Sequence, residues 1–141
     1  MPSTTSGRER PLILLTCGDP AGIGPEIVAR AWGHEPLHAL AHLRVVTDGA
    51  VLDHVLRRRG TFGCPLIVPV SMTDPRPSRP GELLVVEPHG LAIDPTAIQD
   101  KTITAAGGRA AATAVEHAAA AVLAGQADAI VTGPLHKEAL H

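Results

Sequence analysis

The sequence predicts an α/β domain built on a mostly parallel sheet. Short apolar runs alternate along the chain with stretches of helical periodicity, which is the pattern of strands joined by helical crossovers. The runs LILLT at 12–16 and LLVVE at 83–87 are almost wholly apolar, as expected for strands covered on both faces. Glycine-containing loops follow two of the strands directly, where α/β proteins bind their ligands.

The elements are expected in a regular order along the chain. Apolar runs bounded by turn residues predict five strands, at 12–16, 43–47, 65–70, 83–87 and 127–132. Helical patterns predict helices at 25–32, 50–60 and 109–125, with a further helix starting within the last segment, GPLHKEALH.

The first expected helix carries clear start signals. Pro25 suits the first helical position, and the carboxylate of Glu26 complements the positive end of the helix. Ile23, Ile27 and Ala31 fall on one side of this helix, so we expect that side to be its apolar face.

The other two helices end at glycines. The helix at 50–60 has basic residues in its last turn and a stop at Gly60. The helix at 109–125 is rich in alanine and ends at Gly125, and its small residues would let it pack closely on a sheet.

Two long connections interrupt this pattern. The segment SMTDPRPSRPGE, 71–82, carries three of the 13 prolines, which excludes a helix or an interior strand and predicts an exposed connection. From 88 to 108 the pattern is irregular and predicts a long surface excursion. Loops of this length in compact domains are often functional.

Composition bounds the class of protein. A chain of 141 residues is long enough for one domain with a core. The net charge of −2 gives no basic excess for a nucleic-acid backbone, and one Trp, one Phe and no Tyr argue against a stacking surface for bases. The core must therefore rest on aliphatic residues.

The cysteines and the N-terminus carry no special signal. Cys17 and Cys64 lack the spacing of a metal site or a redox pair, and both are expected to be buried free thiols. No apolar run approaches the roughly 18 residues of a membrane span. The segment 1–11 has no apolar signal core and is expected to be a disordered lead, which favours a cytoplasmic protein.

The loop after the first strand is the first candidate site. Gly18, Gly22 and Gly24 would let a ligand approach the backbone, and the helix that starts there favours anions. Such glycines also serve tight turns alone, and the spacing is neither a dinucleotide fingerprint nor a P-loop. Asp19 could orient a lysine or a substrate hydroxyl, or cap the turn with its own side chain.

The loop after the last strand is the second candidate site. Thr132 ends the strand, and His136 and Lys137 project from the first turn of the next helix, where their charge opposes the helix dipole. This placement favours a ligand-facing role over a merely solvated one. His136 and His141 lie on different faces of that helix, so a shared metal site is not expected, and His89 is expected to be a solvated loop residue.

Three motifs resemble one family, 4-hydroxythreonine-4-phosphate dehydrogenase of the pyridoxal-phosphate pathway. GDPAGIGPEI, 18–27, matches the family's opening signature without a break, and TGPLHKEAL, 132–140, matches its later T-[AG]-P-[ILV]-[NH]-K-x-x-[LI] pattern. Between them, TITAAGGRAA, 102–111, is a looser match to a helix start. The order and spacing agree, so the resemblance extends over 12–141.

The resemblance implies a fold and a reaction. The fold is a three-layer α/β/α arrangement like that of isocitrate and isopropylmalate dehydrogenases, with two domains around a cleft and a homodimeric assembly. The reaction is an oxidation of 4-phosphooxy-L-threonine that uses NAD or NADP and a divalent metal (Zn, Mg or Co). The 2-amino-3-oxo acid formed loses carbon dioxide to give 3-amino-2-oxopropyl phosphate.

The resemblance also assigns candidate residues. It implies that the cleft is lined by Asp19, Gly22, Gly24, Thr132, His136, Lys137 and Arg109, with Lys137 the best single candidate for a substrate phosphate or the cofactor. Arg109 could instead pair with a nearby carboxylate. The family's three metal-binding histidines and its phosphate-binding Lys and Arg have no counterpart in this chain. We therefore expect the chain to be the N-terminal portion of a longer enzyme, inactive by itself, with the metal-binding part absent.

Two other interpretations stay open. The first is a paralogue that oxidises D-threonate 4-phosphate, D-erythronate 4-phosphate or a cyclic dihydrodiol, because these relatives share the opening loop. The second is a non-catalytic module that binds a phosphorylated ligand, and its exposed Ala and Leu surfaces would need a partner to cover them. Neither interpretation includes a nucleic-acid or membrane partner.

Overall fold

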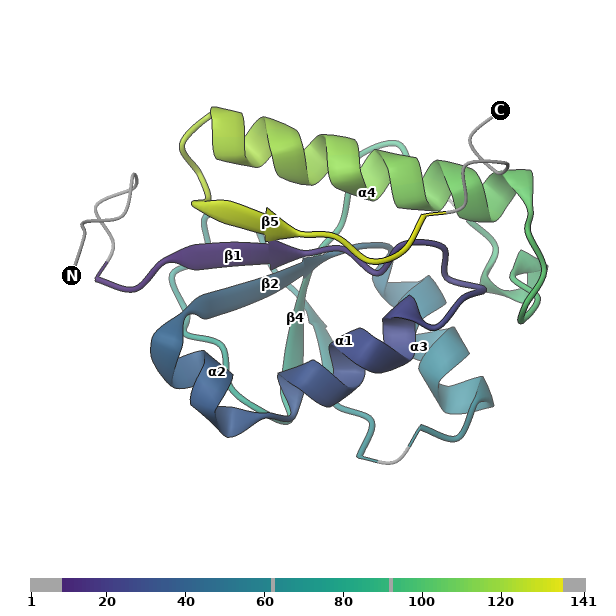
Figure 1. The fold of residues 1–141 in the computed structure, drawn as a ribbon, viewed down its shortest axis with the longest axis horizontal. Coiled ribbons are helices and arrows are strands. Elements are labelled where there is room, and N and C mark those ends of the chain that lie inside the picture. The colour runs from purple at the N-terminus through teal and green to yellow at the C-terminus, as the bar shows by residue number, and fades with distance from the viewer. Residues whose placement is uncertain (1–8, 62, 92, 136–141) are drawn as a thin grey trace.

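The computed structural model describes residues 9–61, 63–91 and 93–135, and its centre is a five-stranded parallel sheet (Figure 1). The strand order is β3-β4-β2-β1-β5, so β1 lies between β2 and β5. The register pairs Leu12 with His42 and Ile13 with Ala129. The strands are β1 (Leu12–Leu15), β2 (His42–Val46), β3 (Leu66–Pro69), β4 (Glu82–Val86) and β5 (Ala129–Val131).

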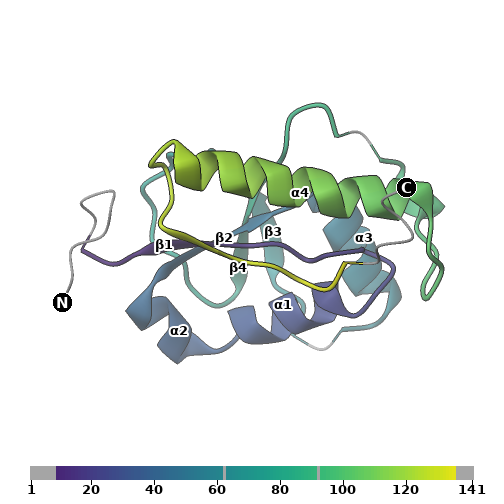
Figure 2. The same ribbon diagram turned by 45° about the horizontal axis from the view of Figure 1, so that its top comes forward.

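Helices cover both faces of this sheet. Three of them lie on one face and the long α4 lies on the other (Figures 1 and 2). The three-layer α/β/α fold expected from the sequence is therefore confirmed. The helices are α1 (Gly24–Trp32), α2 (Glu35–Leu40), α3 (Gly49–Arg58) and α4 (Ala105–Leu123), and a short 3-10 helix η1 spans Pro95–Ala97.

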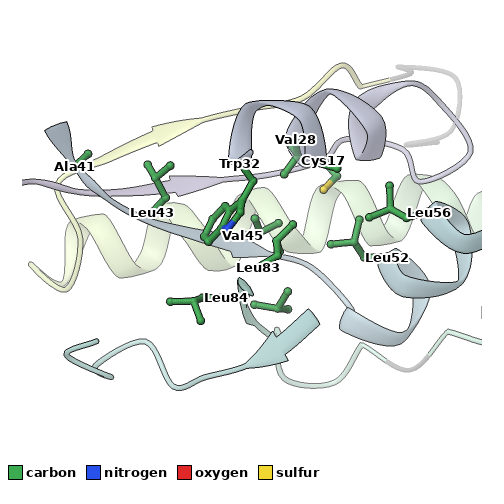
Figure 3. Packing of buried hydrophobic residues seen from close by; sticks show 12 residues of the cluster. Cys17, Val28, Trp32, Ala41, Leu43, Val45, Leu52, Leu56, Leu83 and Leu84 are labelled. Atoms are coloured by element: carbon green, nitrogen blue, oxygen red, sulfur yellow. The ribbon is translucent and has the colours of Figure 1, made fainter. Parts of the chain in front are cut away.

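The core on the α1 face is built around Trp32, which is fully buried (Figure 3). Its indole N–H donates to the backbone carbonyls of Arg79 (2.9 Å) and Glu82 (2.8 Å). Leu43, Val45, Leu52, Leu56, Leu83 and Val85 pack in the same cluster. The one tryptophan of the chain thus ties α1 to the entry of β4.

The prediction of which side of α1 faces the core was wrong. Ile23 and Ile27 are 63% and 51% exposed, whereas Val28 and Trp32, four residues apart, turn toward the sheet. The face of α1 that contacts the sheet is the one that carries Trp32, the largest apolar residue of the helix. As a result, Ile27 of α1 and Ile23, which precedes the helix, are left on the surface.

The alanine helix begins earlier than expected, at Ala105 instead of Arg109. Thr104 caps it, because its Oγ1 accepts a hydrogen bond from the Gly107 N–H at 3.0 Å. Gly107 and Gly108, which fell within the expected irregular segment 88–108, stand in its first turn. An added Cβ at Gly107 would lie 2.6 Å from Oδ1 of Asp19. The helix α2, which starts with a Glu-Pro pair, was not predicted.

The proline-rich connection 71–82 is not wholly exposed, contrary to expectation. Ser78 is buried, and its hydroxyl accepts a hydrogen bond from the Leu43 N–H (3.0 Å) and pairs with Nδ1 of His38 (2.8 Å). The other ring nitrogen of His38 lies 2.7 Å from the carbonyl of Trp32, which can only accept. Nε2 of His38 is therefore the donor in this contact.

Both cysteines are free, as expected. Cys17 is buried, and burial raises the pKa of its thiol to about 12, so it remains a neutral thiol at physiological pH. Cys64 is only partly buried. No helix in the described ranges is long and apolar enough to span a membrane.

Candidate functional site

The two loops singled out in the sequence meet at the carboxyl ends of β1 and β5. Because these strands are parallel neighbours, the segments that follow them leave the sheet at the same edge. The Gly133 N–H donates to the carbonyl of Thr16 at 2.8 Å, and the Asp19 N–H donates to that of Pro134 at 3.3 Å. The described parts of the two loops, 18–24 and 132–135, therefore form one structure although they lie far apart in the chain.

Several glycines of these loops are required by close backbone packing. Gly18 has a φ of +70°, and a Cβ there would lie 2.0 Å from the carbonyl oxygen of Pro134. A Cβ on Gly24 would lie 1.6 Å from the carbonyl oxygen of Cys17, and one on Gly133 would lie 2.5 Å from the Cys17 carbonyl carbon. These three glycines hold the loops together whatever ligand they meet.

Asp19 stands at the base of this arrangement and is 3% exposed. Its Oδ1 accepts a hydrogen bond from the Ala21 N–H at 2.9 Å, which is the turn cap that the sequence allowed. The start of α4 approaches it from the other side, at Gly107. Oδ2 is buried and has no hydrogen-bond partner, so one carboxylate oxygen keeps its full capacity to accept.

A cavity of about 600 Å³ opens beside this loop. This volume is in the range of small-molecule sites. One wall is the loop 19–24 with the start of α1, and the opposite wall is the segment 100–103. Half of the lining residues are apolar or glycine: Ala21, Gly22, Ile23, Gly24, Ile103 and Pro134. The other half are polar or charged: Asp19, Glu26, Arg59, Asp100, Lys101 and Thr102.

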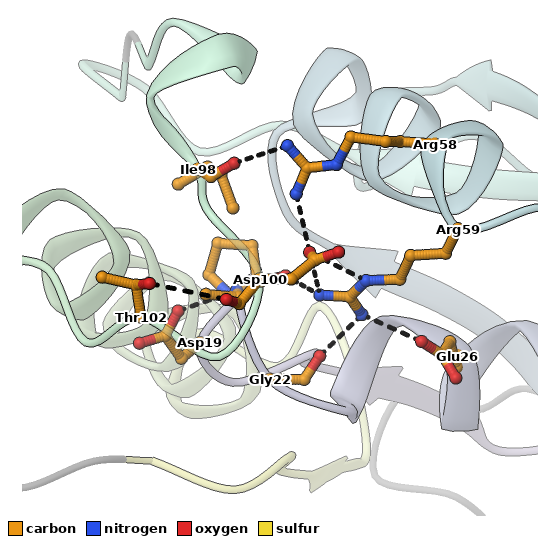
Figure 4. A network of polar contacts seen from close by, with 10 residues as sticks. Asp19, Gly22, Glu26, Arg58, Arg59, Ile98, Asp100 and Thr102 are labelled. Carbon is orange, nitrogen blue, oxygen red and sulfur yellow. Dashed lines mark hydrogen bonds and ion pairs between the residues drawn. The ribbon is translucent and has the colours of Figure 1, made fainter.

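Arg59, at the end of α3, joins the two walls (Figure 4). Its guanidinium donates to the carbonyls of Gly22 (2.7 Å) and Pro20 (3.1 Å) and pairs with Glu26 (3.2 Å). It also contacts Oδ1 of Asp100 twice, from Nε at 3.0 Å and from a terminal nitrogen at 2.8 Å. The Arg59 side chain is only 11% exposed, so these acceptors surround it.

Arg58 supports the same contact from the neighbouring position. It donates to the carbonyl of Ile98 at 2.9 Å and to Asp100 at 2.7 Å. The hydrogen bond from Arg59, followed by that from Arg58, holds the pKa of Asp100 below its usual range. Ile98 is buried against Val51 and Val55, so the expected surface excursion is anchored in the core at this point.

The backbone of Lys101 completes the wall. Its N–H donates to the carbonyl of Ala21 at 2.9 Å, and its φ is +61°. Neither Arg59 nor Lys101 was a candidate from the sequence. A run of three arginines such as 57–59 is also typical of a solvated helix end, where positive charges interact favourably with the helix dipole. Only the packing of α3 directs Arg59 inward.

The cavity gathers some of the predicted site residues and not others. Asp19, Gly22 and Gly24 line it. Thr132 is exposed at the end of β5, and Arg109 is exposed on α4; neither lines the cavity. His136, Lys137 and His141 lie outside the described residues. His89 is exposed, as expected, with its ring edge-to-face against His117.

The residues that the structure describes do not fit a metal centre. Among them no group of three or more His, Cys, Asp or Glu side chains is placed to hold a metal ion. We therefore assign no metal ligand within 9–61, 63–91 and 93–135 and derive no reaction step through one.

Comparison with known proteins agrees with this architecture. The family model of the pyridoxal phosphate biosynthetic protein PdxA matches residues 40–141. D-threonate 4-phosphate dehydrogenase of Bordetella bronchiseptica is 37% identical over 93% of this chain and 36% of its own length. 4-Hydroxythreonine-4-phosphate dehydrogenase of Geobacter metallireducens is 33% identical over 100% of this chain and 39% of its own.

Solved structures show the same relation. The crystal structure of a 4-hydroxythreonine-4-phosphate dehydrogenase from Burkholderia phymatum superposes with a TM-score of 0.81 at 29% identity, over 95% of this chain and 39% of that one. A terephthalate 1,2-cis-dihydrodiol dehydrogenase from Burkholderia xenovorans gives 0.68 at 25% identity, over 94% and 36%. The chain thus spans about two fifths of the length of its relatives, with the fold of their corresponding part. It belongs to the PdxA family, whose relatives are named as dehydrogenases.

Proposed function

We propose that the protein is an NAD(P)-dependent, divalent-metal-dependent dehydrogenase of a 4-phosphorylated hydroxy acid, and that the chain supplies one wall of its cleft. The observation that carries this proposal is the cavity of about 600 Å³ at the carboxyl ends of β1 and β5, built from the family's opening loop. It is large enough for part of a dinucleotide or for a four-carbon substrate. The names of the relatives supply the reaction class.

The substrate is a choice between two related acids. The first candidate is 4-phosphooxy-L-threonine, the substrate of the family that the motifs resemble. Its oxidised product would lose carbon dioxide to 3-amino-2-oxopropyl phosphate in vitamin B6 biosynthesis. D-threonate 4-phosphate is the second candidate, because relatives named for that substrate are 32–37% identical over 92–94% of the chain. Both are 4-phosphorylated four-carbon hydroxy acids, so the same cleft wall could serve either.

The proposed reaction needs two cofactors besides the residues of the cleft. A nicotinamide cofactor would supply the hydride acceptor, and a divalent ion, held by residues outside the described ones, would supply Lewis-acid chemistry. The described residues would shape the cleft: the loop at Gly22 and Gly24 would bring backbone against the ligand, and Asp19 would accept a hydrogen bond through its unpaired oxygen. Thr132, His136, Lys137 and Arg109 remain proposed cleft residues, Lys137 foremost, in a cytoplasmic homodimer.

A substrate panel tests this proposal. The protein, purified at the length its gene encodes, is assayed for NADH or NADPH formation with 4-phosphooxy-L-threonine, D-threonate 4-phosphate, D-erythronate 4-phosphate and a cis-dihydrodiol. We expect turnover of one phosphorylated acid, loss of that turnover in EDTA, and its return when Zn, Mg or Co is added back.

Two outcomes would contradict the proposal. Turnover that is unaffected by EDTA after exhaustive dialysis would remove the metal from the reaction. Binding of a phosphorylated acid with no turnover of any substrate, under either cofactor, would favour the non-catalytic module instead.

A further inference from the structure

Lys101 has a left-handed backbone conformation and an ammonium group without a partner among the described residues. Among the described residues it is the one residue other than glycine with a positive φ, +61°. A side chain in this left-handed region is destabilising unless the surroundings impose it, and such residues concentrate at binding sites. A glycine would adopt this conformation with less strain than a lysine does.

The surroundings of Lys101 fix its backbone from both sides. Its N–H donates to the carbonyl of Ala21 at 2.9 Å, and this hydrogen bond joins the two segments that line the cavity. The preceding residue, Asp100, is held by Arg58 and Arg59. The following residue, Thr102, donates its N–H to the carbonyl of Gln99 at 3.2 Å. The position of the lysine at the cavity is thus set by contacts of its neighbours, and its own side chain contributes to none of them.

The charges at the cavity leave the Lys101 ammonium uncompensated. Arg59 is occupied by Glu26, Asp100 and two carbonyls. Asp19 is buried beneath the loop, against the start of α4. Lys101 is exposed and lines the cavity, and its ammonium makes no hydrogen bond or ion pair within the described part of the chain. The positive end of the 19-residue helix α4 begins at Thr104, three residues further on, and adds to the local positive potential.

We propose that Lys101 binds a phosphate group of the ligand in this cavity. The inference rests on the proposed function, because both ligands of that reaction carry phosphate: the substrate at its 4-position and the dinucleotide in its pyrophosphate. The shared chemistry is an ammonium donating to a phosphate oxygen, which is a charge-assisted hydrogen bond. The strained backbone is then the cost of placing a long cationic side chain at the cavity wall.

Isothermal titration calorimetry of full-length variants tests the assignment. Lys101→Met keeps the length of the side chain and removes its charge. We expect it to lower the affinity for one phosphate source by about 10- to 100-fold, as loss of a charged hydrogen bond would. Lys101→Arg should retain affinity within a few-fold, and Arg57→Met, a surface change at a residue that pairs only with Asp53 among the contacts described, should change nothing.

The ligands of the titration separate the two sources. A loss confined to D-threonate 4-phosphate or 4-phosphooxy-L-threonine, with affinity for the unphosphorylated D-threonate or 4-hydroxythreonine unchanged, assigns Lys101 to the substrate phosphate. A loss confined to NAD or NADP assigns it to the pyrophosphate. Unchanged affinity of Lys101→Met for all of these ligands would overturn the proposal.

Lys101→Gly distinguishes binding from a structural role. Glycine tolerates the positive φ, so we expect a higher melting temperature together with the same loss of affinity as in Lys101→Met. A Lys101→Gly protein that is less stable, or that binds as well as wild type, would contradict the account. If the wild-type protein turned over no substrate, titration with inorganic pyrophosphate would still test Lys101, so failure of the reaction and failure of this assignment can be told apart.

Discussion

Replacement of Gly24 by alanine is expected to destabilise the protein by at least ~3 kcal/mol, the upper range for overpacking. The new Cβ would lie 1.6 Å from the carbonyl oxygen of Cys17. The backbone fixes the positions of both atoms, so no side-chain rotation can relieve the clash. Relief would need the loop 18–24 to leave α1, and the cavity wall would move with it. The free energy of unfolding in urea, followed by far-UV circular dichroism, measures the loss.

Gly33→Ala is the matched control for this change. Gly33 lies at the other end of the same helix with a φ of −71°, and its Cβ would meet only ordinary contacts at 3.5 Å. We expect Gly33→Ala to stay within about 0.5 kcal/mol of wild type, as surface substitutions usually do. Equal stability of Gly24→Ala and Gly33→Ala would show that the close approach of Gly24 to Cys17 does not exist.

Arg59→Met is the second change with a large expected effect. It leaves the carbonyls of Pro20 and Gly22 without their donor and removes the link between the two cavity walls. Two such lost hydrogen bonds, with ion pairs discounted because Glu26 and Asp100 are about 40% exposed, predict a loss of ~2–4 kcal/mol. We expect the same variant to raise KM for the ligand that the 100–103 segment contacts, because that wall is no longer held.

The pH dependence of this effect follows from Asp100. The folded-state pKa of Asp100 is depressed chiefly by the hydrogen bond from Arg59. This stabilisation is therefore present above the unfolded pKa of about 3.9 and is lost as pH falls through the lower folded value. The difference in stability between wild type and Arg59→Met should be constant from about pH 5 to 8 and should narrow below about pH 4.

Arg57→Met serves as the control for Arg59→Met. Arg57 is on the same helix and pairs with Asp53, but its side chain is 65% exposed. Its loss should cost no more than about 0.5 kcal/mol. If Arg59→Met were as mild as Arg57→Met, Arg59 would not join the cavity walls in solution.

Local sequence signals were enough for the framework of the fold. Every expected strand is present with its ends shifted by at most two residues, because short continuous apolar runs bounded by turn residues are typical of buried strands. The opening loop was also placed correctly: Asp19, Gly22 and Gly24 do line a cavity at the carboxyl end of β1.

What the sequence could not give depends on contacts between distant segments. The apolar face of α1 was misassigned because Ile23 and Ile27 form as good a stripe as Val28 and Trp32 until the position of the sheet is known. Arg59 looks like any helix-end arginine, and its acceptors at 20–26 and 100 are about 40 residues away in either direction. The left-handed backbone of Lys101 has no sequence signature at all.

The measurement that tests the central claim most directly is a crystal structure of the full-length protein with the turned-over acid and its nicotinamide cofactor. The central claim is that the cavity between the loop 19–24 and the segment 100–103 is one wall of the reaction cleft. We predict that substrate or cofactor contacts both segments, with a phosphate oxygen on the Lys101 ammonium. Substrate and cofactor both bound with neither segment in contact would contradict the account.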